Sequence, residues 1–248
     1  MKRPYLSVII PVYNEQKRLH TLPVITTFFS RQKFTTEIIF VDDGSSDKTR
    51  DKLIAFAKKH PHVRIIGYSA NKGKGHAIRV GMLRAQGRYH LFMDVDLSTP
   101  LDTLIDFLPL LSSHDVVIGS RKTKGAKIKH HQPWLREFLG KSFTKFSQVL
   151  LRVPVSDFTC GFKAFSHKAS KEIFTRSHID RWGFDCEVIT LAIKRGFSVK
   201  EVPVSWSNDV HTKVHFPRDI ILSLTDLLRI KWYLMADRYT LRDALGDK

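Results

Sequence analysis

The chain has 248 residues, which suits one large α/β domain and is too short for two full-sized enzymatic domains. Its 42% hydrophobic and 11% aromatic residues exclude an intrinsically disordered protein. The 41 Lys and Arg outnumber the 24 Asp and Glu, and the net charge of +17 predicts an anionic partner: nucleic acid, an anionic membrane surface or phosphorylated substrates.

Short apolar runs alternate with segments of helical spacing over the first half of the chain. Each run is rich in β-branched residues and is followed by polar or turn residues, so each predicts a buried strand. The runs span residues 6–12, 37–43, 63–68, 88–96 and 115–120. This alternation predicts an α/β fold with a parallel, doubly wound sheet whose ligands lie at the carboxyl ends of the strands.

Two amphipathic helices are expected outside this sheet. Apolar residues recur on one helical face at about 133–152 and again in the C-terminal segment. We therefore predict one domain over residues 1–215, which includes the first of these helices, and an amphipathic helical tail over 216–248. The sequence has no uninterrupted apolar stretch of the roughly 18 residues needed to cross a bilayer. The expected location is cytoplasmic, with peripheral attachment to the cytoplasmic face of a membrane.

The motif MDVDLS at 93–98 is the strongest chemical signal. Asp94 and Asp96 project to the same side at the end of a predicted strand, and their carboxylates repel each other unless a cation lies between them. Mg²⁺ or Mn²⁺, held by carboxylates and by substrate phosphate oxygens, would neutralise a departing diphosphate. Taken alone, the motif fits equally well a helix-capping Asp94 and a solvated Asp96.

Two weaker motifs also follow predicted strands. VDDGSSDKT at 41–49 places Asp42 and Asp43 where a carboxylate can accept hydrogen bonds from a nucleobase N–H or from ribose hydroxyls. A plain strand-to-helix turn explains the residues after them. NKGKGHAIRVG at 71–81 places Lys74 between glycines ahead of a helix, which suits a diphosphate. It is neither a Walker A sequence nor a dinucleotide fingerprint.

Six motifs in order resemble the family-2 glycosyltransferases of the dolichyl-phosphate sugar synthase type. They are PVYNE at 11–15, VDDGS at 41–45, NKGKG at 71–75, MDVDLS at 93–98, GSR at 119–121 and SDFTCGFKAF at 156–165. The resemblance covers nearly the whole chain. CGFKAF, together with RWGFDCEVI at 181–189 and VPVSWSN at 202–208, is more similar to the glucose synthases than to the mannose synthases, so glucose from UDP-glucose is favoured.

This resemblance implies a single Rossmann-like GT-A fold, with a nucleotide diphosphate sugar as donor and a polyprenyl phosphate lipid as acceptor. The residues that it places around the donor nucleoside are Pro11, Tyr13, Glu15, Asp42, Asp43, Asn71 and Lys74. It also implies that Asp94 faces the donor ribose and sugar and that Asp96 binds the metal beside it. Arg121 and Arg136 would bind the acceptor phosphate, because a guanidinium matches phosphate oxygens. A solvated helix residue is the alternative for Arg136.

Asp157 matches the acidic residue that serves such enzymes as a catalytic base or positions the acceptor. A phosphate is already anionic near neutral pH, so we expect Asp157 to position the acceptor for one in-line displacement with inversion. Glu187 either faces the sugar hydroxyls or pairs with Arg181 or Lys194. Ser98 stands where mannose-type relatives have Gln, so water would complete the metal shell. Eukaryotic glucose synthases carry an N-terminal anchor, and this sequence predicts none.

Other functions fit parts of the same sequence. A basic nucleic-acid-binding protein would use the positive charge on backbone phosphates, but aromatic residues interleaved with basic ones on amphipathic helices favour a lipid headgroup region and no nucleic acid. An enzyme of the same fold could instead use GDP-mannose or UDP-GlcNAc as donor, or a soluble saccharide as acceptor. It would have the same aspartate pair, and a different acceptor would be recognised at Arg121 and the segment after it. A dinucleotide-dependent oxidoreductase would need a glycine fingerprint after the first strand, where PVYNE stands instead.

Overall fold

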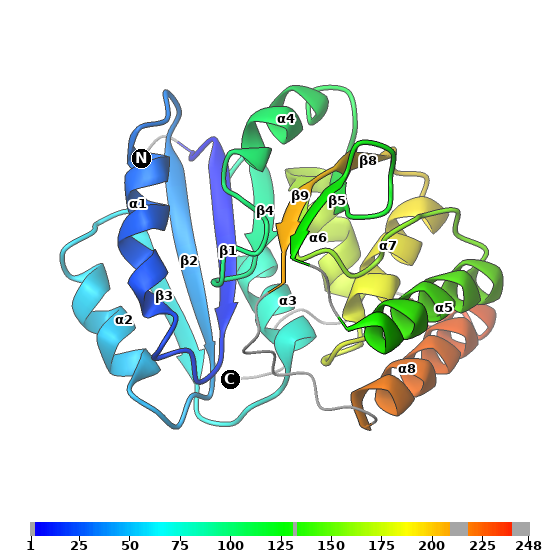
Figure 1. Cartoon of the computed structure of the whole chain (residues 1–248). Helices are drawn as coiled ribbons and strands as arrows, with labels where there is room; N and C mark the ends of the chain where they lie inside the picture. The colour runs from blue at the N-terminus through cyan, green and yellow to red at the C-terminus, as the bar shows by residue number, and fades with distance from the viewer. Residues whose placement is uncertain (1–2, 131–132, 209–217, 240–248) are drawn as a thin grey trace.

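The computed structural model describes residues 3–130, 133–208 and 218–239 (Figure 1). The strands are β1 (Leu6–Val12), β2 (Thr36–Asp43), β3 (Val63–Tyr68), β4 (Tyr89–Met93), β5 (Val116–Ser120), β6 (Lys127–His130), β7 (Phe162–Ser166), β8 (Val199–Pro203) and β9 (Ser205–Ser207). Seven of them form one sheet in the order β3-β2-β1-β4-β7-β5-β8, and β6 pairs with β9 separately. Only β7 runs antiparallel to its neighbours in the described sheet.

Helices cover both faces of the sheet. They are η1 (Leu19–Thr21), α1 (Leu22–Ser30), α2 (Thr49–Ala57), α3 (Lys74–Arg84), α4 (Thr103–Leu110), α5 (Trp134–Leu151), α6 (His167–Arg176), α7 (Phe184–Lys194) and α8 (Arg218–Met235). On one face α1, α2 and α4 pack against Val8, Ile10 and Phe40. On the other face α3, α6 and α7 pack against Ile9 and Ile39, because successive residues of a strand point to opposite faces. The buried strands are therefore apolar on both sides.

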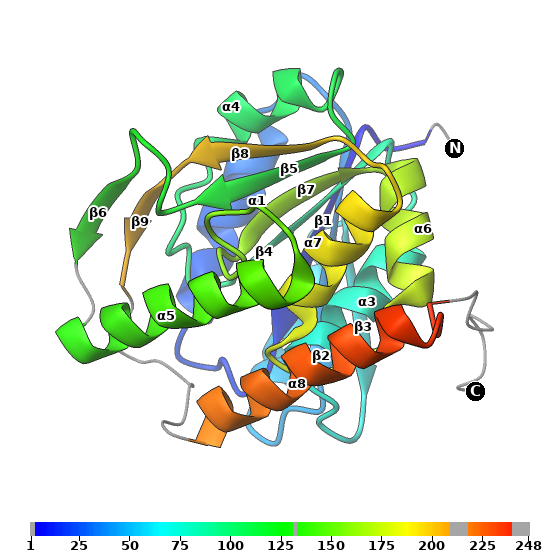
Figure 2. The same cartoon turned by 90° about the vertical axis from the view of Figure 1, so that its right-hand side faces the viewer.

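The last two long helices form an outer layer. α5 and α8 lie side by side beyond α7, and both run across the same flank of the molecule (Figure 2). Leu151 of α5 and Leu227 and Ile230 of α8 join the core on that side of the sheet. None of the helices within the described residues is long and apolar enough to cross a membrane.

The structure confirms the predicted α/β class and five predicted strands, with one shortened. β4 ends at Met93, so Asp94 and Asp96 lie in the turn that follows and not in a strand that continues to residue 96. Val95, between them, is buried in the core, which leaves both carboxylates at the edge of the sheet. The predicted helix at 133–152 is α5, and α8 forms part of the predicted tail, of which residues 216–217 and 240–248 lie outside the described residues.

Candidate active site

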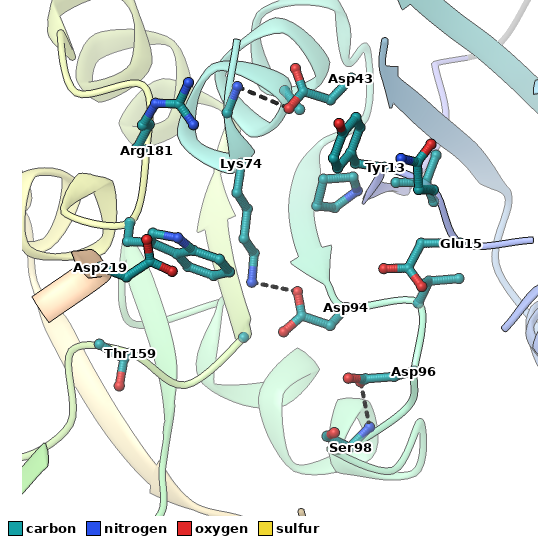
Figure 3. A pocket seen from close by; sticks show the side chains of 18 of the residues that line it. Tyr13, Glu15, Asp43, Lys74, Asp94, Asp96, Ser98, Thr159, Arg181 and Asp219 are labelled. Atoms are coloured by element: carbon teal, nitrogen blue, oxygen red, sulfur yellow. Dashed lines mark hydrogen bonds and ion pairs between the residues drawn. The ribbon is translucent and has the colours of Figure 1, made fainter. Parts of the chain in front are cut away.

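A cleft of about 550 Å³ opens at the carboxyl ends of the central strands (Figure 3). That volume suits a small-molecule ligand. The residues predicted from the sequence that line it are Pro11, Tyr13, Glu15, Asp43, Asn71, Lys74, Asp94, Asp96, Arg121 and Arg136. Asp42 and Asp157, which were also predicted, are fully buried and do not line the cleft. The topology thus brings together side chains from the ends of β1, β2, β4 and β5.

Asp43 builds the wall of the cleft beside α3. One carboxylate oxygen accepts hydrogen bonds from the Tyr68 hydroxyl at 2.7 Å and the Lys72 backbone N–H at 2.9 Å. The other accepts from the Asn71 side chain at 2.7 Å and the Gly73 backbone N–H at 2.9 Å. A carboxylate has about four acceptor positions, and these donors use them. Asp43 therefore fixes the loop that leads into α3, and its predicted bond to a nucleoside stays a prediction.

Asp42 occupies the neighbouring position on β2. One of its oxygens accepts a hydrogen bond from the Ser45 backbone N–H at 3.2 Å, which closes the turn after the strand. Its other oxygen is buried and has no hydrogen-bond partner among the described residues. Consecutive strand residues point to opposite faces, so Asp42 lies on the side away from Asp43. Its predicted contact with the nucleoside also stays a prediction.

Asp94 and Asp96 face the cleft from the turn after β4 (Figure 3). The ammonium of Lys74, the first residue of α3, lies 2.6 Å from Asp94 Oδ1. Asp96 accepts a hydrogen bond from the Ser98 backbone N–H at 2.9 Å. Burial and the nearby charge of Asp94 raise the pKa of Asp96. Burial opposes the charge on Lys74, but the carboxylates around it outweigh that effect and raise its pKa.

This pair of carboxylates fits a divalent cation. A Cβ at Gly161 would contact Asp94 Oδ2, so the missing side chain keeps space open around that oxygen. Throughout residues 3–130, 133–208 and 218–239, no group of three or more His, Cys, Asp or Glu side chains could hold a metal ion. Phosphate oxygens and water would have to complete the shell, which is the usual arrangement for Mg²⁺ held by one or two carboxylates.

Arg121 enters the cleft from the residue after β5 and is held by Asp157. Its Nε and Nη2 atoms lie 2.7 Å from Oδ2 and 2.8 Å from Oδ1 of the carboxylate. Nη2 also donates to the Thr159 hydroxyl at 2.7 Å, and the Trp206 ring lies 5.2 Å from the guanidinium carbon. Burial opposes the charge on Asp157, but Arg121 outweighs it and holds the pKa of that carboxyl well below its usual range.

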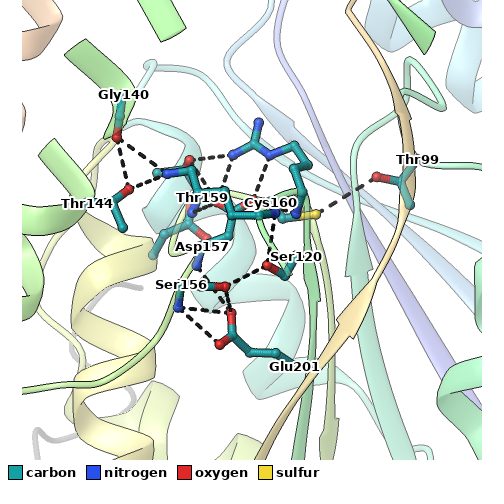
Figure 4. A network of polar contacts seen from close by, with 12 residues as sticks. Thr99, Ser120, Gly140, Thr144, Ser156, Asp157, Thr159, Cys160 and Glu201 are labelled. Carbon is teal, nitrogen blue, oxygen red and sulfur yellow. Dashed lines mark hydrogen bonds and ion pairs between the residues drawn. The ribbon is translucent and has the colours of Figure 1, made fainter. Parts of the chain in front are cut away.

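A second carboxylate fixes the turn that carries Asp157 (Figure 4). Glu201 of β8 accepts hydrogen bonds from the Ser156 hydroxyl at 2.6 Å and from the Ser156 and Asp157 backbone N–H groups at 3.0 and 3.2 Å. The Ser156 hydroxyl also lies 2.8 Å from that of Ser120. The network ties two neighbouring strands of the sheet to Arg121, so the guanidinium is positioned before any ligand arrives.

Arg136 brings a second guanidinium to the same part of the cleft from the first turn of α5. Arg121 and Arg136 line the same cleft, and burial together with the charge of Arg121 lowers the pKa of Arg136. Lys122 attaches α5 to the sheet, because its ammonium donates to the Thr144 hydroxyl at 2.5 Å. Two guanidiniums gathered in this way form a site for an anion such as phosphate.

The cleft also contains residues that no sequence motif placed there. Arg181 and Trp182 line it from the loop before α7, and the Trp182 ring lies 5.9 Å from the Lys74 ammonium. Trp206 and Asp219 line it from β9 and from the start of α8. The segment RWGFDCEVI was recognised as a motif, but nothing in it indicates that the first two residues reach the cleft.

Glu187 neither faces the cleft nor pairs with Arg181 or Lys194. It is fully buried and accepts hydrogen bonds from the His178 and Ile179 backbone N–H groups, both at 2.9 Å, and from the Tyr239 hydroxyl at 3.0 Å. Burial raises its pKa to about 7. Both alternatives considered for Glu187 were wrong, since its role is to hold the loop that precedes α7.

Comparisons with known proteins identify relatives along most of the chain. The model of the family described as Glycosyl transferase family 2 matches residues 7–174. Dolichyl-phosphate beta-glucosyltransferase ALG5C of Trichomonas vaginalis is 33% identical, and the match covers 96% of this chain and 74% of that protein. The dolichyl-phosphate beta-glucosyltransferase of Saccharomyces cerevisiae is 33% identical, with 92% and 74% covered.

A solved structure has the same fold. It is glucosyl-3-phosphoglycerate synthase from Mycobacterium tuberculosis in complex with Mn²⁺, uridine-diphosphate-glucose and phosphoglyceric acid. The two structures superimpose with a TM-score of 0.66 at 18% sequence identity, covering 92% of this chain and 80% of the other. This likeness confirms the fold that the sequence motifs implied.

Proposed function

We propose a function from the premise that the chain belongs to glycosyltransferase family 2, as its match to the family model and to relatives 33% identical shows. The chain is thus a glycosyltransferase, and the predicted family is confirmed. The proposed reaction is the transfer of glucose from UDP-glucose to a polyprenyl phosphate. The names of the relatives support the sugar and the acceptor class. The observation that carries the proposal is one cleft that holds both a carboxylate pair and a guanidinium pair.

The donor would lie between the ends of β1 and β2 and the start of α3. Pro11, Tyr13, Glu15 and Asn71 line that part of the cleft and suit the nucleoside. Asp94 and Asp96 would hold Mg²⁺ or Mn²⁺, which stabilises the negative charge that develops on a departing diphosphate. Lys74, at the N-terminus of α3, adds an ammonium and the positive end of the helix to the same region.

The acceptor phosphate would bind between Arg121 and Arg136. Charge-assisted hydrogen bonds from guanidiniums fix a phosphate with one oxygen aimed at the anomeric carbon. That oxygen is already anionic near neutral pH, so no side chain has to remove a proton from it. Asp157, whose pKa is held low and whose oxygens face Arg121, acts as a positioning residue. A single in-line displacement inverts the configuration of the anomeric carbon.

The acceptor site borders a surface suited to lipid. Arg136 of α5 and Asp219 of α8 line the cleft, so both outer helices border it. The large apolar side chains that these helices expose are Trp134, Leu135, Phe138, Phe146, Val149, Ile221, Leu228, Trp232 and Met235. Lys141, Lys145 and Arg229 are exposed beside them. Exposed aromatic and basic residues on amphipathic helices support peripheral docking on an anionic membrane, which we place at its cytoplasmic face.

An assay of the purified chain tests the reaction. The protein is incubated with Mn²⁺, a polyprenyl phosphate and in turn UDP-glucose, GDP-mannose and UDP-GlcNAc, and the lipid fraction is analysed for a charged glycolipid. We expect product from UDP-glucose. Arg121→Ala should abolish transfer while UDP binding, measured by calorimetry, stays within about twofold, because Arg121 would contact only the acceptor. Equal transfer by Arg121→Ala, or preference for a soluble saccharide acceptor, contradicts the proposal.

Flotation on liposomes tests the docking surface. Vesicles of phosphatidylcholine with phosphatidylserine should carry the wild-type chain upward, and Phe138→Ser with Trp232→Ser should prevent this. Ile105→Ser is the matched control, because Ile105 is 62% exposed but lies on α4 over the opposite face of the sheet. Binding to duplex DNA at the same salt is measured alongside. Stronger binding to DNA than to the vesicles would support a nucleic-acid-binding protein instead.

A further inference from the structure

We propose that Lys74 is a built-in counter-ion of the aspartate pair, which the donor diphosphate draws away, so that metal and nucleotide bind cooperatively. This inference rests on the proposed function, because it assigns the donor site a diphosphate and a divalent cation. The observation behind it is that the Lys74 ammonium lies 2.6 Å from Asp94 Oδ1, so it already neutralises one of the two carboxylates that would hold the metal (Figure 3). Lysine and metal therefore compete for one carboxylate.

The backbone at Lys74 is fixed, so only its side chain can move. Asp43 holds the backbone N–H groups of Lys72 and Gly73, both at 2.9 Å. Gly73 has a φ of +113°, and a Cβ there would contact the Asp180 carbonyl oxygen, so the loop cannot shift toward that side. The long side chain of Lys74 extends from this fixed point across the cleft to Asp94 (Figure 3). Rotation about its own bonds suffices to move the ammonium.

The charges around Lys74 explain why metal and nucleotide would help each other. A divalent cation that enters alone has to share Asp94 with the ammonium and remain beside it, and like charges at such separations repel. A nucleoside diphosphate supplies new oxygen partners for the ammonium. Asp94 is then released to the cation, which the phosphates also bind. The Trp182 ring lies 5.9 Å from the ammonium and lines the same cleft, so the ammonium stays beside it when it leaves Asp94 for the diphosphate.

The coupling can be measured without any catalytic turnover. Binding of Mn²⁺ to the full chain is followed by the loss of the free-ion electron paramagnetic resonance signal, with and without UDP. We expect Lys74→Gln to bind Mn²⁺ alone about tenfold more tightly than the wild type, a factor within the usual range of coupling between sites. The increase in Mn²⁺ affinity that UDP causes should shrink by about the same factor, although direct phosphate contacts with the metal remain.

Two further variants separate the ion pair from other effects. Lys72→Gln removes the same charge two residues away, where the ammonium lies 5.7 Å from the Tyr68 ring, and should bind Mn²⁺ as the wild type does. Lys74→Arg keeps a cation beside Asp94 and should bind Mn²⁺ alone as weakly as the wild type. Thermal unfolding shows which variants are folded, and if Lys74→Gln is not, Lys74→Met replaces it.

Each outcome bears on one of the two proposals. Equal affinity of the wild type and Lys74→Gln, or Lys74→Met where that replaces it, for Mn²⁺ alone overturns the role of Lys74, and so does tighter binding by Lys74→Arg. In both cases the proposed function stands, provided that the wild type binds Mn²⁺ together with UDP. A wild-type chain that binds neither Mn²⁺ nor UDP overturns both proposals.

Discussion

Arg121 and Asp157 form a two-point ion pair in which the carboxylate is fully buried and the guanidinium lines the cleft. The Asp157 oxygens also accept the backbone N–H groups of Arg121 and Thr159, at 3.0 and 3.1 Å. All of its acceptor positions thus face protein donors. The relationship explains how an acidic residue can matter for the reaction without contacting a substrate.

Asp157→Asn should weaken acceptor binding and leave donor binding intact. The amide cannot form the two-point pair, so Arg121 loses its fixed position, and we expect the KM for polyprenyl phosphate to rise about 10- to 100-fold. Breaking a buried ion pair on one side costs about 3–5 kcal/mol, so the free energy of unfolding should also fall. Steady-state kinetics and urea unfolding measure the two effects.

The separate effects of Asp157→Asn on KM and kcat distinguish positioning from base catalysis. Arg121 holds the pKa of Asp157 well below its usual range, so the carboxylate stays ionised between pH 6 and 9 in either role. If Asp157 only positions Arg121, the KM for polyprenyl phosphate rises and kcat falls by less than about tenfold. A fall in kcat of about 100-fold or more with an unchanged KM would show that Asp157 accepts a proton during the reaction.

Gly161→Ala should damage the site with little effect on the fold. The new Cβ would meet Asp94 Oδ2, so the carboxylate has to move away from the position that the metal requires. A misplacement of about 1 Å can cost roughly 100-fold in rate, and we expect kcat/KM to fall by about that factor. Kinetics and the thermal unfolding midpoint are measured together.

Gly140→Ala is the matched control for that substitution. Gly140 lies within α5, and a Cβ there would meet nothing within 4 Å. Alanine in a helix is more favourable than glycine by roughly 0.5–1 kcal/mol, so this variant should be slightly more stable and fully active. Equal activity of the two alanine variants would show that the space beside Asp94 is unimportant.

Removal of the metal should stop the reaction, and Asp96 should set the concentration of metal that the reaction needs. Chelation with EDTA is expected to abolish transfer, and excess Mn²⁺ or Mg²⁺ to restore it. Asp96→Asn should raise the Mn²⁺ concentration for half-maximal activity at least tenfold, since even outer-shell substitutions at metal sites cost about 10- to 100-fold. Asp102→Asn changes an exposed carboxylate at the start of α4 and should behave as the wild type. Full activity in EDTA would rule out the metal.

The sequence predicted the parts of the fold that local patterns encode. The runs at 6–12 and 63–68 match β1 and β3 residue for residue. β1 is buried and apolar along almost all of its length, whereas β3 lies at the edge of the sheet and is mostly half-buried.

β7 and β8 were not predicted, since each is a run of five residues interrupted by charge, at Lys163 in β7 and at Lys200 and Glu201 in β8. Lys163 is the second residue of β7 and is fully buried. Burial is possible because its ammonium reaches Asp185 of α7 at 2.5 Å and the Cys160 carbonyl oxygen at 2.6 Å. No local pattern reveals that pairing.

The candidate site was predicted as a set of residues but not as a set of contacts. The motifs indicated correctly that Asp94, Asp96 and Arg121 lie at strand ends, where the rule for parallel sheets places ligands. They could not show that the Asp43 carboxylate accepts hydrogen bonds from the loop before α3. The donors, the Lys72 and Gly73 backbone N–H groups, lie about 30 residues away in the sequence. The cleft residues Trp182 and Asp219 come from segments that reach the site only through tertiary packing.

A buried histidine at the opposite end of β4 should make the fold sensitive to acid. His90 is fully buried, with Nδ1 2.7 Å from the Ser170 hydroxyl and Nε2 3.1 Å from the Gly87 carbonyl oxygen. Burial, together with the charges of His167, Lys171 and Arg3, lowers the pKa of His90 from 6.5 to about 3. As the pH falls through this range, the unfolded chain takes up a proton that the folded chain does not. The neutral form therefore stabilises the fold above pH 6.5, and that stability is lost toward pH 3.

The free energy of unfolding should decrease by about 1.4 kcal/mol per pH unit below 6.5 on account of His90 alone. His90→Gln removes this titration, so its stability should fall less steeply over the same range even if it is lower at pH 7. His20→Gln, which replaces an exposed histidine, should keep the wild-type slope. Urea unfolding at a series of pH values between 4 and 7 gives the slopes. Parallel slopes for the wild type and His90→Gln would mean that His90 takes up its proton over the same pH range in the folded and the unfolded chain, and the acid sensitivity would then have to come from other groups.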